Sequence, residues 1–443
     1  MKIPQTPPDF VSIIDDLTQN GRYQIFLQFL ANQNLATGRK YEHWDKLRYK
    51  KPPEDLTINE WWAVIKFSRV SSQRLINLFD KNNKPFRYAL PDYVLKKLHE
   101  IDRDASGKIQ FSEKVANQDT KDRYIQSSLI EEAITSSQLE GAATTREVAK
   151  EMIRTGRRPI SESEQMILNN FKAMKHVGKL KGEKITPKAI ENLHNLLTDK
   201  ILDSTKSPYR VPGDGIKVYD NQDNKVLHDP PDASEIPMRL KKLCEFANEK
   251  ETDVFMHPVL KAILLHFWMA YDHPFKDGNG RTARALFYWY MLSQGYWLFE
   301  FVSISTILKK SPTKYARAFL YTETDDNDLT YFIIHQLDII VKAIDSLHSY
   351  IQKKTEELKE TEKLLKPSSE LNYRQIALLG HALKHPGQDY TIESHRKSHG
   401  VTYQTSRTDL LNLYERGLLT KIKLSKAFIF QPSPNLSKKL KSQ

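Results

Sequence analysis

The chain has almost no cysteine and no long apolar run. Cys244 is the single cysteine among 443 residues, so an intramolecular disulfide is excluded and a reducing compartment is favoured. The opening residues, MKIPQTPPDF, contain no apolar stretch of the kind that a signal peptide needs, and the longest apolar stretch elsewhere is interrupted by Lys261 and His266. We therefore expect a cytoplasmic protein with neither a signal peptide nor a membrane span. The length of 443 residues predicts two or three domains.

A short polar segment, DHPFKDGNGRTAR at residues 272–284, separates two apolar segments. Apolar residues recur at helical spacing over 260–271 and again over 283–292, which predicts two largely buried helices joined by a loop. Gly278 and Gly280 have no Cβ, so backbone N–H groups can turn inward at the start of the second helix. Such a helix N-terminus favours an anion, for example a phosphate.

The charged side chains of this segment indicate phosphate chemistry. Arg281 and Arg284 share one face of the second helix, and two cations at a helix N-terminus are unfavourable unless an anion compensates them. Asp277 offers one carboxylate of the kind that binds Mg²⁺ together with substrate oxygens and water. His273 can accept a proton from a hydroxyl near neutral pH. A calcium loop is excluded, because Arg281 stands where that loop needs an acid.

The segment HPFKDGNGRTAR, residues 273–284, resembles the Fic family signature His-x-Phe-x-Asp/Glu-Gly-Asn-Gly-Arg-x-x-Arg at every defining position. Fic proteins mostly transfer AMP from ATP to a Ser, Thr or Tyr hydroxyl of a protein, so the resemblance implies a Mg²⁺-dependent protein adenylyltransferase. It assigns His273 as the general base and Asp277 as the Mg²⁺ ligand. The nucleotide-binding residues that it implies are Gly278, Asn279 and Gly280 at the α- and β-phosphates, Arg281 as a phosphate clamp, and Arg284 as the partner of the γ-phosphate.

Residues 214–230 contain two short runs with strand character, IKVYD and KVLHD, separated by the polar turn NQDN. This pattern predicts a β-hairpin. It resembles the Fic flap, which holds a target segment by adding it as an edge strand. Because strand addition uses main-chain hydrogen bonds, the sequence of the hairpin does not identify the target protein or its acceptor residue. An ordinary surface hairpin is the alternative.

Residues 125–141, IQSSLIEEAITSSQLEG, have the spacing of an amphipathic helix that ends at Glu140, before Gly141. The last six residues resemble the inhibitory motif Ser/Thr-x-x-x-Glu-Gly/Asn of one class of Fic proteins, which assigns Ser136, Glu140 and Gly141. In that class the glutamate reaches the second arginine of the signature and occupies the space that the γ-phosphate needs. Glu140 is therefore the expected anion opposite Arg284, and a solvated surface glutamate is the alternative.

The rest of the chain divides at changes of pattern. Residues 1–110 predict a mostly helical module packed on the core, and they resemble the N-terminal region of some long bacterial Fic proteins. Residues 111–335 are expected to form the Fic core. A long helix or linker is expected over 336–366, where apolar residues at nearly 3.5-residue spacing indicate pairing with a second copy or packing on the core. A separate domain is expected over 367–443.

Residues 367–443 resemble a winged helix-turn-helix, with three helical segments followed by two alternating strands. The expected N-caps are Thr391 for the second helix and Thr402 for the third. From residue 371 onward, twelve Lys and Arg stand against four Asp and Glu, so a surplus of eight positive charges of the formal +12 lies there. Duplex DNA is therefore a candidate partner. The residues expected to face DNA are Tyr403, Gln404, Thr405 and Arg407. A protein-docking or dimerisation role is the alternative.

The expected fold class is mainly α: a Fic-type helical core with a β-hairpin flap, plus a C-terminal winged-helix domain. The expected function is AMP transfer from ATP to a protein hydroxyl, with Mg²⁺ as cofactor, an unknown target at the flap, inhibition by Glu140 and a second copy as a candidate partner. A DNA-binding regulator that senses a nucleotide in the Fic pocket is the alternative. The presence of His273 favours catalysis, because sensing needs no base. Nucleotide preference and removal of AMP by the same pocket stay open here.

Overall fold

The computed structural model describes the chain except for residues 32–40, 106–117, 204, 221–223, 250–254, 366–370, 385–386, 425–426 and 442–443. The described residues are mainly helical, with three two-stranded antiparallel hairpins, which confirms the expected fold class. They form two compact units, residues 1–347 and 348–443. No helix of the described residues is long and apolar enough to cross a membrane.

The N-terminal module is less purely helical than expected, because it contains a hairpin between two of its helices. Its elements are α1 (Phe10–Gln19), α2 (Tyr23–Ala31), α4 (Trp44–Leu47), α5 (Ile58–Ser72), β1 (Arg74–Phe79), β2 (Pro85–Tyr88) and α6 (Asp92–Ala105). Trp44 and Trp62 are buried in one cluster with Ile13 and Leu17 of α1. These two tryptophans therefore belong to a small core that the module forms by itself.

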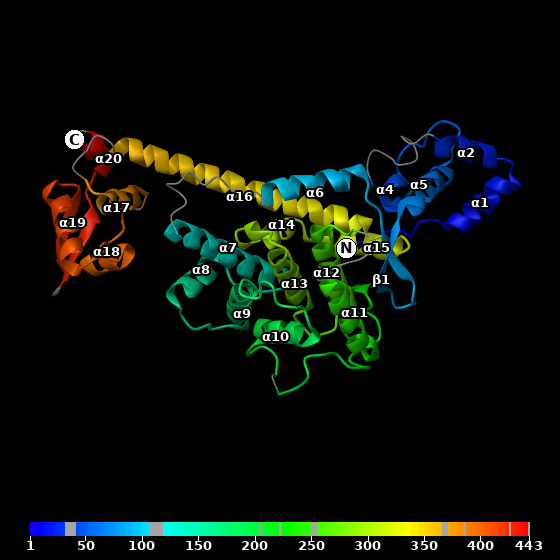
Figure 1. Ribbon diagram of the computed structural model, residues 1–443, viewed down its shortest axis with the longest axis horizontal. Helices are drawn as coiled ribbons and strands as arrows, with labels where there is room; N and C mark the ends of the chain where they lie inside the picture. The colour runs from blue at the N-terminus through cyan, green and yellow to red at the C-terminus, as the bar shows by residue number, and fades with distance from the viewer. Residues whose placement is uncertain are drawn as a thin grey trace. The chain divides into compact units, whose positions relative to one another are not determined.

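The core of the first unit is built around α12 and α13, whose side chains are almost all buried. The elements, in order, are α7 (Gln118–Leu139), α8 (Arg146–Thr155), α9 (Glu162–Val177), α10 (Pro187–Thr198), β3 (Val218–Tyr219), β4 (Val226–His228), the 3₁₀ helix η1 (Ala233–Glu235), α11 (Ile236–Asn248), α12 (Pro258–Asp272), α13 (Asn279–Ser293), the 3₁₀ helix η2 (Trp297–Glu300), α14 (Ile304–Leu308) and α15 (Pro312–Thr324). In Figure 1, α7 and α9 lie on one side of α13 and α11 lies beside α12. Both predicted flanking helices are confirmed, and the second begins at Asn279.

The predicted hairpin at residues 214–230 is present as β3 and β4, which pair antiparallel. Residues 221–223 of its polar turn lie outside the described residues. The predicted helix at 125–141 is the second half of α7, which ends at Leu139, one residue earlier than expected. The long helix expected from residue 336 is α16 (Thr330–Leu365), which begins earlier.

Buried charged side chains join the N-terminal module to the loop between α15 and α16. Lys66 of α5 forms a buried ion pair with Asp325. Arg69 of the same helix donates to the Tyr331 hydroxyl at 2.8 Å, and its guanidinium carbon lies 3.9 Å from the centre of the Tyr41 ring. A buried charge that loses its partner is costly, so these contacts favour one arrangement. The module thereby fixes the C-terminal end of α15.

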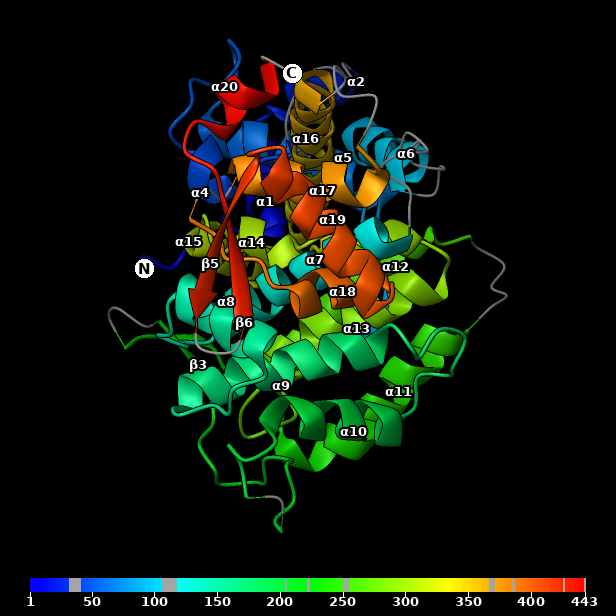
Figure 2. The same cartoon turned by 90° about the vertical axis from the view of Figure 1, so that its left-hand side faces the viewer.

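The second unit has its own core and the predicted order of helices and strands. Its elements after α16 are α17 (Tyr373–Lys384), α18 (Ile392–His399), α19 (Tyr403–Glu415), β5 (Leu419–Leu424), β6 (Ala427–Pro432) and α20 (Leu436–Lys441). Figure 2 shows the helices α17 to α19 and the hairpin of β5 and β6. The predicted caps of α18 and α19 are confirmed, because the hydroxyls of Thr391 and Thr402 accept from backbone N–H groups. Residues 436–441 form α20, because Leu436 and Leu440 are buried in this core.

Candidate active site

The loop between α12 and α13 is held together by its own side chains. His273 ends α12 with φ +46°, and Gly278 precedes α13 with φ +78°. The Asn279 side chain bridges the loop: its Oδ1 accepts from the Phe275 N–H at 2.9 Å, and its Nδ2 donates to the Phe275 carbonyl at 2.8 Å. The side-chain amide of Asn279 is therefore engaged within the loop, and its backbone N–H belongs to the first turn of α13, whose N–H groups lack intrahelical acceptors.

Aromatic stacking fixes the same loop to the core. The fully buried Phe275 ring lies against the His194 ring, with centroids 3.7 Å apart, and against the Tyr209 ring at 5.0 Å. His194 Nε2 also lies 2.9 Å from the Asp277 carbonyl oxygen. Phe275 therefore holds the loop against the core. His194 was missed, because it lies on α10 and no local spacing connects it with the loop.

Each arginine at the start of α13 has its own carboxylate. Arg281 donates to Asp277 Oδ2 at 2.9 Å and to the Leu197 carbonyl at 3.0 Å. Arg284 donates to Glu140 Oε1 at 2.8 Å. From the sequence, Glu140 was the expected compensating anion for both arginines. That view is incomplete, because Asp277 lies one helical turn before Arg281 and reaches it directly.

The segment 136–141, at the end of α7, contacts Arg284 through two residues. Besides the pair with Glu140, Arg284 donates from Nε to the Ser136 hydroxyl and from a terminal nitrogen to the Ser136 carbonyl, both at 2.9 Å. Gly141 has φ +99°, a conformation that suits glycine and lets the chain turn away after Glu140. Burial opposes the charge of Arg284, but the Glu140 carboxylate raises the pKa of this guanidinium above its ordinary value. The structure thus brings Ser136, Glu140 and Arg284 together.

Glu140 lies directly over the first turn of α13. A Cβ added to Gly280 would lie 2.2 Å from Glu140 Oε1, so any other residue here would require the carboxylate to move. The N–H groups of a first helical turn lack intrahelical acceptors and favour an anion. The carboxylate of Glu140 therefore occupies the position that a phosphate would take at this helix start.

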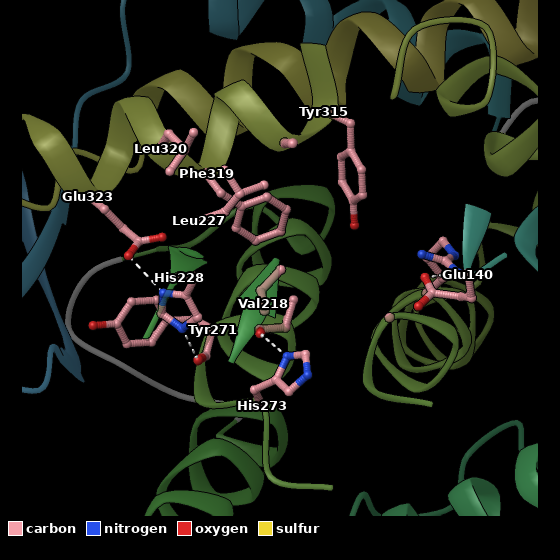
Figure 3. Close-up of a pocket in the computed structure, with 14 residues that line it drawn as sticks. Glu140, Val218, Leu227, His228, Tyr271, His273, Tyr315, Phe319, Leu320 and Glu323 are labelled. Atoms are coloured by element: carbon pink, nitrogen blue, oxygen red, sulfur yellow. Dashed lines mark hydrogen bonds and ion pairs between the residues drawn. The ribbon is translucent and has the colours of Figure 1, made fainter. Parts of the chain in front are cut away.

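A cavity of about 180 Å³ adjoins this position. The flap, the end of α12, the start of α13 and α15 all contribute to its wall, and Figure 3 shows the residues that line it. Val218, Leu227, Phe319 and Leu320 make up much of the apolar part. The Tyr315 ring extends from α15 into the cavity, and its hydroxyl lies 2.8 Å from His266 Nε2. Sequence reasoning missed Tyr315, because nothing in its neighbourhood resembles a site.

His273 lies in this cavity with a defined orientation. Its Nδ1 is 3.3 Å from the Ala270 carbonyl oxygen and donates to it, which leaves Nε2 as the acceptor. Burial, followed by the positive charge of His228, lowers the pKa of His273 from 6.5 to about 4. At neutral pH the imidazole of His273 is therefore uncharged and able to accept a proton.

His228 of the flap is a second histidine of this cavity that sequence reasoning missed. Its Nδ1 lies 2.8 Å from Glu323 Oε2, and its Nε2 lies 2.7 Å from the Tyr271 carbonyl oxygen. It therefore contacts both α15 and the residue that stands two positions before His273. In the sequence it reads only as part of an alternating strand.

Asp277 provides a carboxylate that fits Mg²⁺ in the way expected. The side chain is 50% exposed at the edge of the loop, and one of its oxygens accepts from Arg281. Within the described ranges, no group of three or more His, Cys, Asp and Glu side chains is arranged to hold a metal ion. One carboxylate is nevertheless enough where substrate phosphates and water supply the remaining oxygens.

In the second unit, the residues expected to face DNA divide into two kinds. Tyr403, Gln404 and Arg407 are exposed on the first turns of α19, with Tyr403 at 56%. Thr405 is only partly exposed and belongs to the helix cap, because its N–H donates to the Thr402 hydroxyl at 3.2 Å. Three of the four expected side chains are therefore free to contact a partner.

Known proteins share this fold and this loop. Residues 184–291 match the Fic/DOC family model. Protein adenylyltransferase Fic of Drosophila mojavensis is 29% identical over 156 residues, which are 35% of this chain and 29% of that protein. Protein adenylyltransferase Fic of Aedes aegypti is 35% identical over 69 residues, 16% of this chain and 14% of that protein. These matches thus span less than a third of the relatives' own length.

A solved structure shows the same fold. The crystal structure of a Fic family protein from Desulfovibrio desulfuricans G20 has a TM-score of 0.51 and 17% sequence identity, and covers 78% of this chain and 97% of that one. The arrangement of α10 to α13 around the signature loop defines a Fic domain. The chain therefore contains a Fic domain over residues 184–291, and the curated proteins that it resembles are named Fic adenylyltransferases.

Proposed function

We propose that this protein transfers AMP from ATP to a Ser, Thr or Tyr hydroxyl of a target protein, and that Glu140 inhibits the transfer. The observation that carries the proposal is the Glu140 carboxylate over the first turn of α13, 2.8 Å from Arg284. A buried arginine beside a helix N-terminus is a binding site for an anion. Here the chain's own carboxylate takes the place of a phosphate, which is a means of blocking a nucleotide site.

The cavity next to this position supports a nucleotide as the ligand. Its apolar wall, with Val218, Leu227 and the Phe319 ring, suits the flat face of a base. The backbone N–H groups at Gly278 and Gly280 and the guanidinium of Arg284 suit the phosphates. A Mg²⁺ ion bound by Asp277, phosphate oxygens and water would neutralise part of the phosphate charge.

The transfer itself requires one base in the right protonation state. Nε2 of His273 accepts the proton of the target hydroxyl, and the hydroxyl oxygen attacks the α-phosphorus of ATP. A new P–O bond forms to the target, the bond to the β-phosphate oxygen breaks, and pyrophosphate leaves with that electron pair. The flap hairpin, which ends in this cavity, is the element that we expect to hold the target segment.

Inhibition follows from the place of Glu140. A γ-phosphate bound by Arg284 would meet the Glu140 carboxylate, and two anions cannot share one guanidinium at this distance without mutual repulsion. ATP then binds with its phosphates displaced. Displacement of a reacting atom by about 1 Å can lower a rate on the order of a hundredfold. The resting protein should therefore transfer AMP slowly.

Labelled ATP tests the proposal directly. The purified wild type, Glu140→Gly and Glu140→Gln are incubated with ATP labelled at the α-phosphate, Mg²⁺ and a cell extract, and labelled proteins are identified by mass spectrometry. We expect label on protein from the Glu140→Gly variant and none when the label is on the γ-phosphate. Glu140→Gln keeps the size of the side chain and separates the effect of its charge from that of its volume. Absence of α-label from all three would refute the proposal.

For the second unit, we propose binding to duplex DNA. Tyr403, Gln404 and Arg407 are exposed together at the start of α19, and Lys423 is exposed on the adjacent strand β5. Side chains of the types that read bases and contact phosphates in other proteins therefore lie on one helix and its neighbouring hairpin, which supports the proposal. The nucleotide-sensing regulator stays the alternative function of the whole chain, and it predicts DNA affinity that changes with ATP.

The proposed DNA binding of the second unit is tested with the full chain. Arg407→Ala should weaken binding to a mixed-sequence duplex and lower the slope of log affinity against log salt by about one if Arg407 contacts a phosphate. Arg396→Ala is the matched control, because the Arg396 guanidinium already pairs with Glu393 at 2.7 Å. Duplex binding that is absent even at low salt would favour a protein-docking role for this unit.

A further inference from the structure

The flap is too small to hold its own position. β3 and β4 pair at Val218 with His228 and at Tyr219 with Val226, and the register shifts between these two pairs. An isolated two-stranded hairpin is at best marginally stable in water even when it is longer and regular. Contacts between flap side chains and the core must therefore decide where the flap lies.

His228 makes two such contacts, and both of its partners are acceptors. Nδ1 lies 2.8 Å from the Glu323 carboxylate and Nε2 lies 2.7 Å from the Tyr271 carbonyl oxygen, as the dashed lines of Figure 3 show. A neutral imidazole carries one N–H, and only an imidazolium donates from both nitrogens. His228 is therefore a buried cation, 8% exposed, that forms an ion pair with Glu323.

The contact with Tyr271 lies at the end of the helix that carries His273. The last carbonyl groups of a helix lack intrahelical donors, and cations are favoured there. His228 donates to the Tyr271 carbonyl, while Arg210 donates to the carbonyls of Asp272 at 3.0 Å and of His273 at 2.8 Å. Two cations, one of them from the flap, thus cap the turn at which His273 stands.

We propose that His228 is a positioning residue for the protein acceptor: by donating to both Tyr271 and Glu323 it holds the flap in register with the turn that carries His273. The inference rests on the proposed AMP transfer and deepens it. A target strand that adds to the flap has its hydroxyl placed by the flap, whereas the base is placed by α12. His228 is the side chain that joins these two elements, and Glu323 joins them to α15, the opposite wall of the cavity.

The charge of His228 depends on the groups that face it. Glu323 faces it from α15, Asp272 and His273 from the end of α12, and Lys81 from the turn between β1 and β2. Burial opposes the charge, but the Glu323 carboxylate raises the pKa of His228 above 6.5. The double contact is therefore complete below this raised pKa and is lost as the pH rises through it. The rate of AMP transfer should therefore fall as the pH rises through this pKa, because the flap no longer aligns the acceptor hydroxyl with His273.

The test compares variants in the Glu140→Gly background, in which the inhibitory carboxylate is absent. His228→Phe keeps a ring of similar size but removes both donors. We expect kcat/KM for the protein acceptor to fall at least about tenfold, as for a misplaced reacting group, and by a larger factor than the affinity for ATP, whose phosphates bind at α13 rather than at the flap. Glu323→Gln keeps an acceptor for Nδ1 but removes the charge, so it should move the alkaline limb of the pH profile to lower pH.

His257→Phe is the matched control. His257 also pairs with a carboxylate, Asp102 at 2.9 Å, but it does so at the opposite end of α12. It should leave acceptor kinetics and the pH profile unchanged. Acceptor kinetics of His228→Phe equal to those of Glu140→Gly alone, or an alkaline limb unmoved by Glu323→Gln, would overturn the inference. Absence of transfer from Glu140→Gly itself would instead refute the proposed function, and the inference with it.

Discussion

The Glu140 carboxylate and the Arg284 guanidinium lie 2.8 Å apart, although 144 residues separate them in the sequence. Ser136, one turn earlier on α7, accepts two further hydrogen bonds from the same guanidinium. The end of α7 is thereby tied to the first turns of α13. Because a first helical turn favours an anion, a movement of α7 that carries Glu140 away would leave this helix start without its carboxylate.

Replacement of Glu140 by glycine should activate the protein. The change removes the carboxylate from the first turn of α13 and frees Arg284 for a γ-phosphate, so AMP transfer should rise on the order of a hundredfold. Loss of the partner of a buried cation should also lower thermal stability without ATP, by about 1–3 kcal/mol because Glu140 itself is partly exposed. Label incorporation and thermal melts with and without ATP measure both effects.

A double variant identifies the cause of this activation. Glu140→Gly combined with Arg284→Ala should lose the gain, because the freed guanidinium is the group that places the γ-phosphate. A Glu140→Gly variant that transfers AMP at the wild-type rate across ATP concentrations, with a competent target present, would rule out the inhibitory role.

Glu132, two helical turns before Glu140, should also affect the rate of AMP transfer. It is buried on α7, and its carboxylate accepts from the Tyr288 hydroxyl at 2.9 Å, the Ser303 hydroxyl at 2.8 Å and the Ser305 N–H at 3.0 Å. These contacts hold α7 against α13 and α14, so they set the position of Glu140. Glu132→Gln should lower stability by about 1–3 kcal/mol, because a neutral amide cannot satisfy these donors equally well. It should also raise basal transfer.

The neighbouring residue gives the control for Glu132. Glu131 pairs at 2.6 Å with the exposed Arg146 rather than with core donors. Pairs of this kind contribute roughly 0–1 kcal/mol, so Glu131→Gln should change neither the melting temperature nor the rate appreciably. Equal behaviour of the two variants would show that Glu132 does not set the position of α7.

The sequence predicted those parts of the site that are local in the chain. The helix–loop–helix around residues 273–284, the turn at Gly141 and the caps at Thr391 and Thr402 each follow from a few neighbouring residues. Their geometry depends on positive φ, on capping hydroxyls and on helical spacing, and each of these can be recognised in a few consecutive residues of the sequence. The pair of Glu140 with Arg284 was predictable only because a family motif connected two distant segments.

The remaining parts depend on contacts that no local pattern carries. His228 and Glu323 are 95 positions apart, and an alternating strand or an amphipathic helix gives no sign of which polar residue will be buried beside which. Glu132 reads as a polar position of a helix, yet tertiary packing buries it. The same packing lowers the pKa of His273, which residue type alone would place near 6.5.

Removal of the base should separate chemistry from binding. His273→Ala deletes the proton acceptor but leaves the anion site at α13 intact, so transfer should fall by at least about a hundredfold, the usual scale of a general base. The affinity of the Glu140→Gly form for ATP, measured by calorimetry, should change little. Loss of ATP binding equal to the loss of transfer would mean that His273 supports the fold of the loop rather than the proton transfer.

Asp277 should control the metal dependence. Asp277→Ala removes the carboxylate and leaves Arg281 without its partner at 2.9 Å, so both Mg²⁺-stimulated transfer and some stability should be lost. Asp277→Asn keeps an acceptor for Arg281 and should recover the stability but not the activity. Persistent full stimulation by Mg²⁺ in either variant would exclude Asp277 as a ligand. The measurements are label incorporation over a Mg²⁺ titration and thermal melts.

The pH dependence of transfer should report the buried state of His273. A base with the ordinary pKa of 6.5 would be half protonated at that pH, whereas the lowered value of about 4 leaves His273 neutral. The rate of the Glu140→Gly form should therefore stay level between pH 7.5 and about 6 and fall only toward the lowered pKa. Between 6.5 and 4 the unfolded state binds more protons at this residue, so stability also falls as the pH falls. Single-turnover rates measure the acid limb of the pH profile, and circular dichroism at each pH confirms that the protein is folded. A half-maximal rate near pH 6.5 would show that His273 is not the buried base described above.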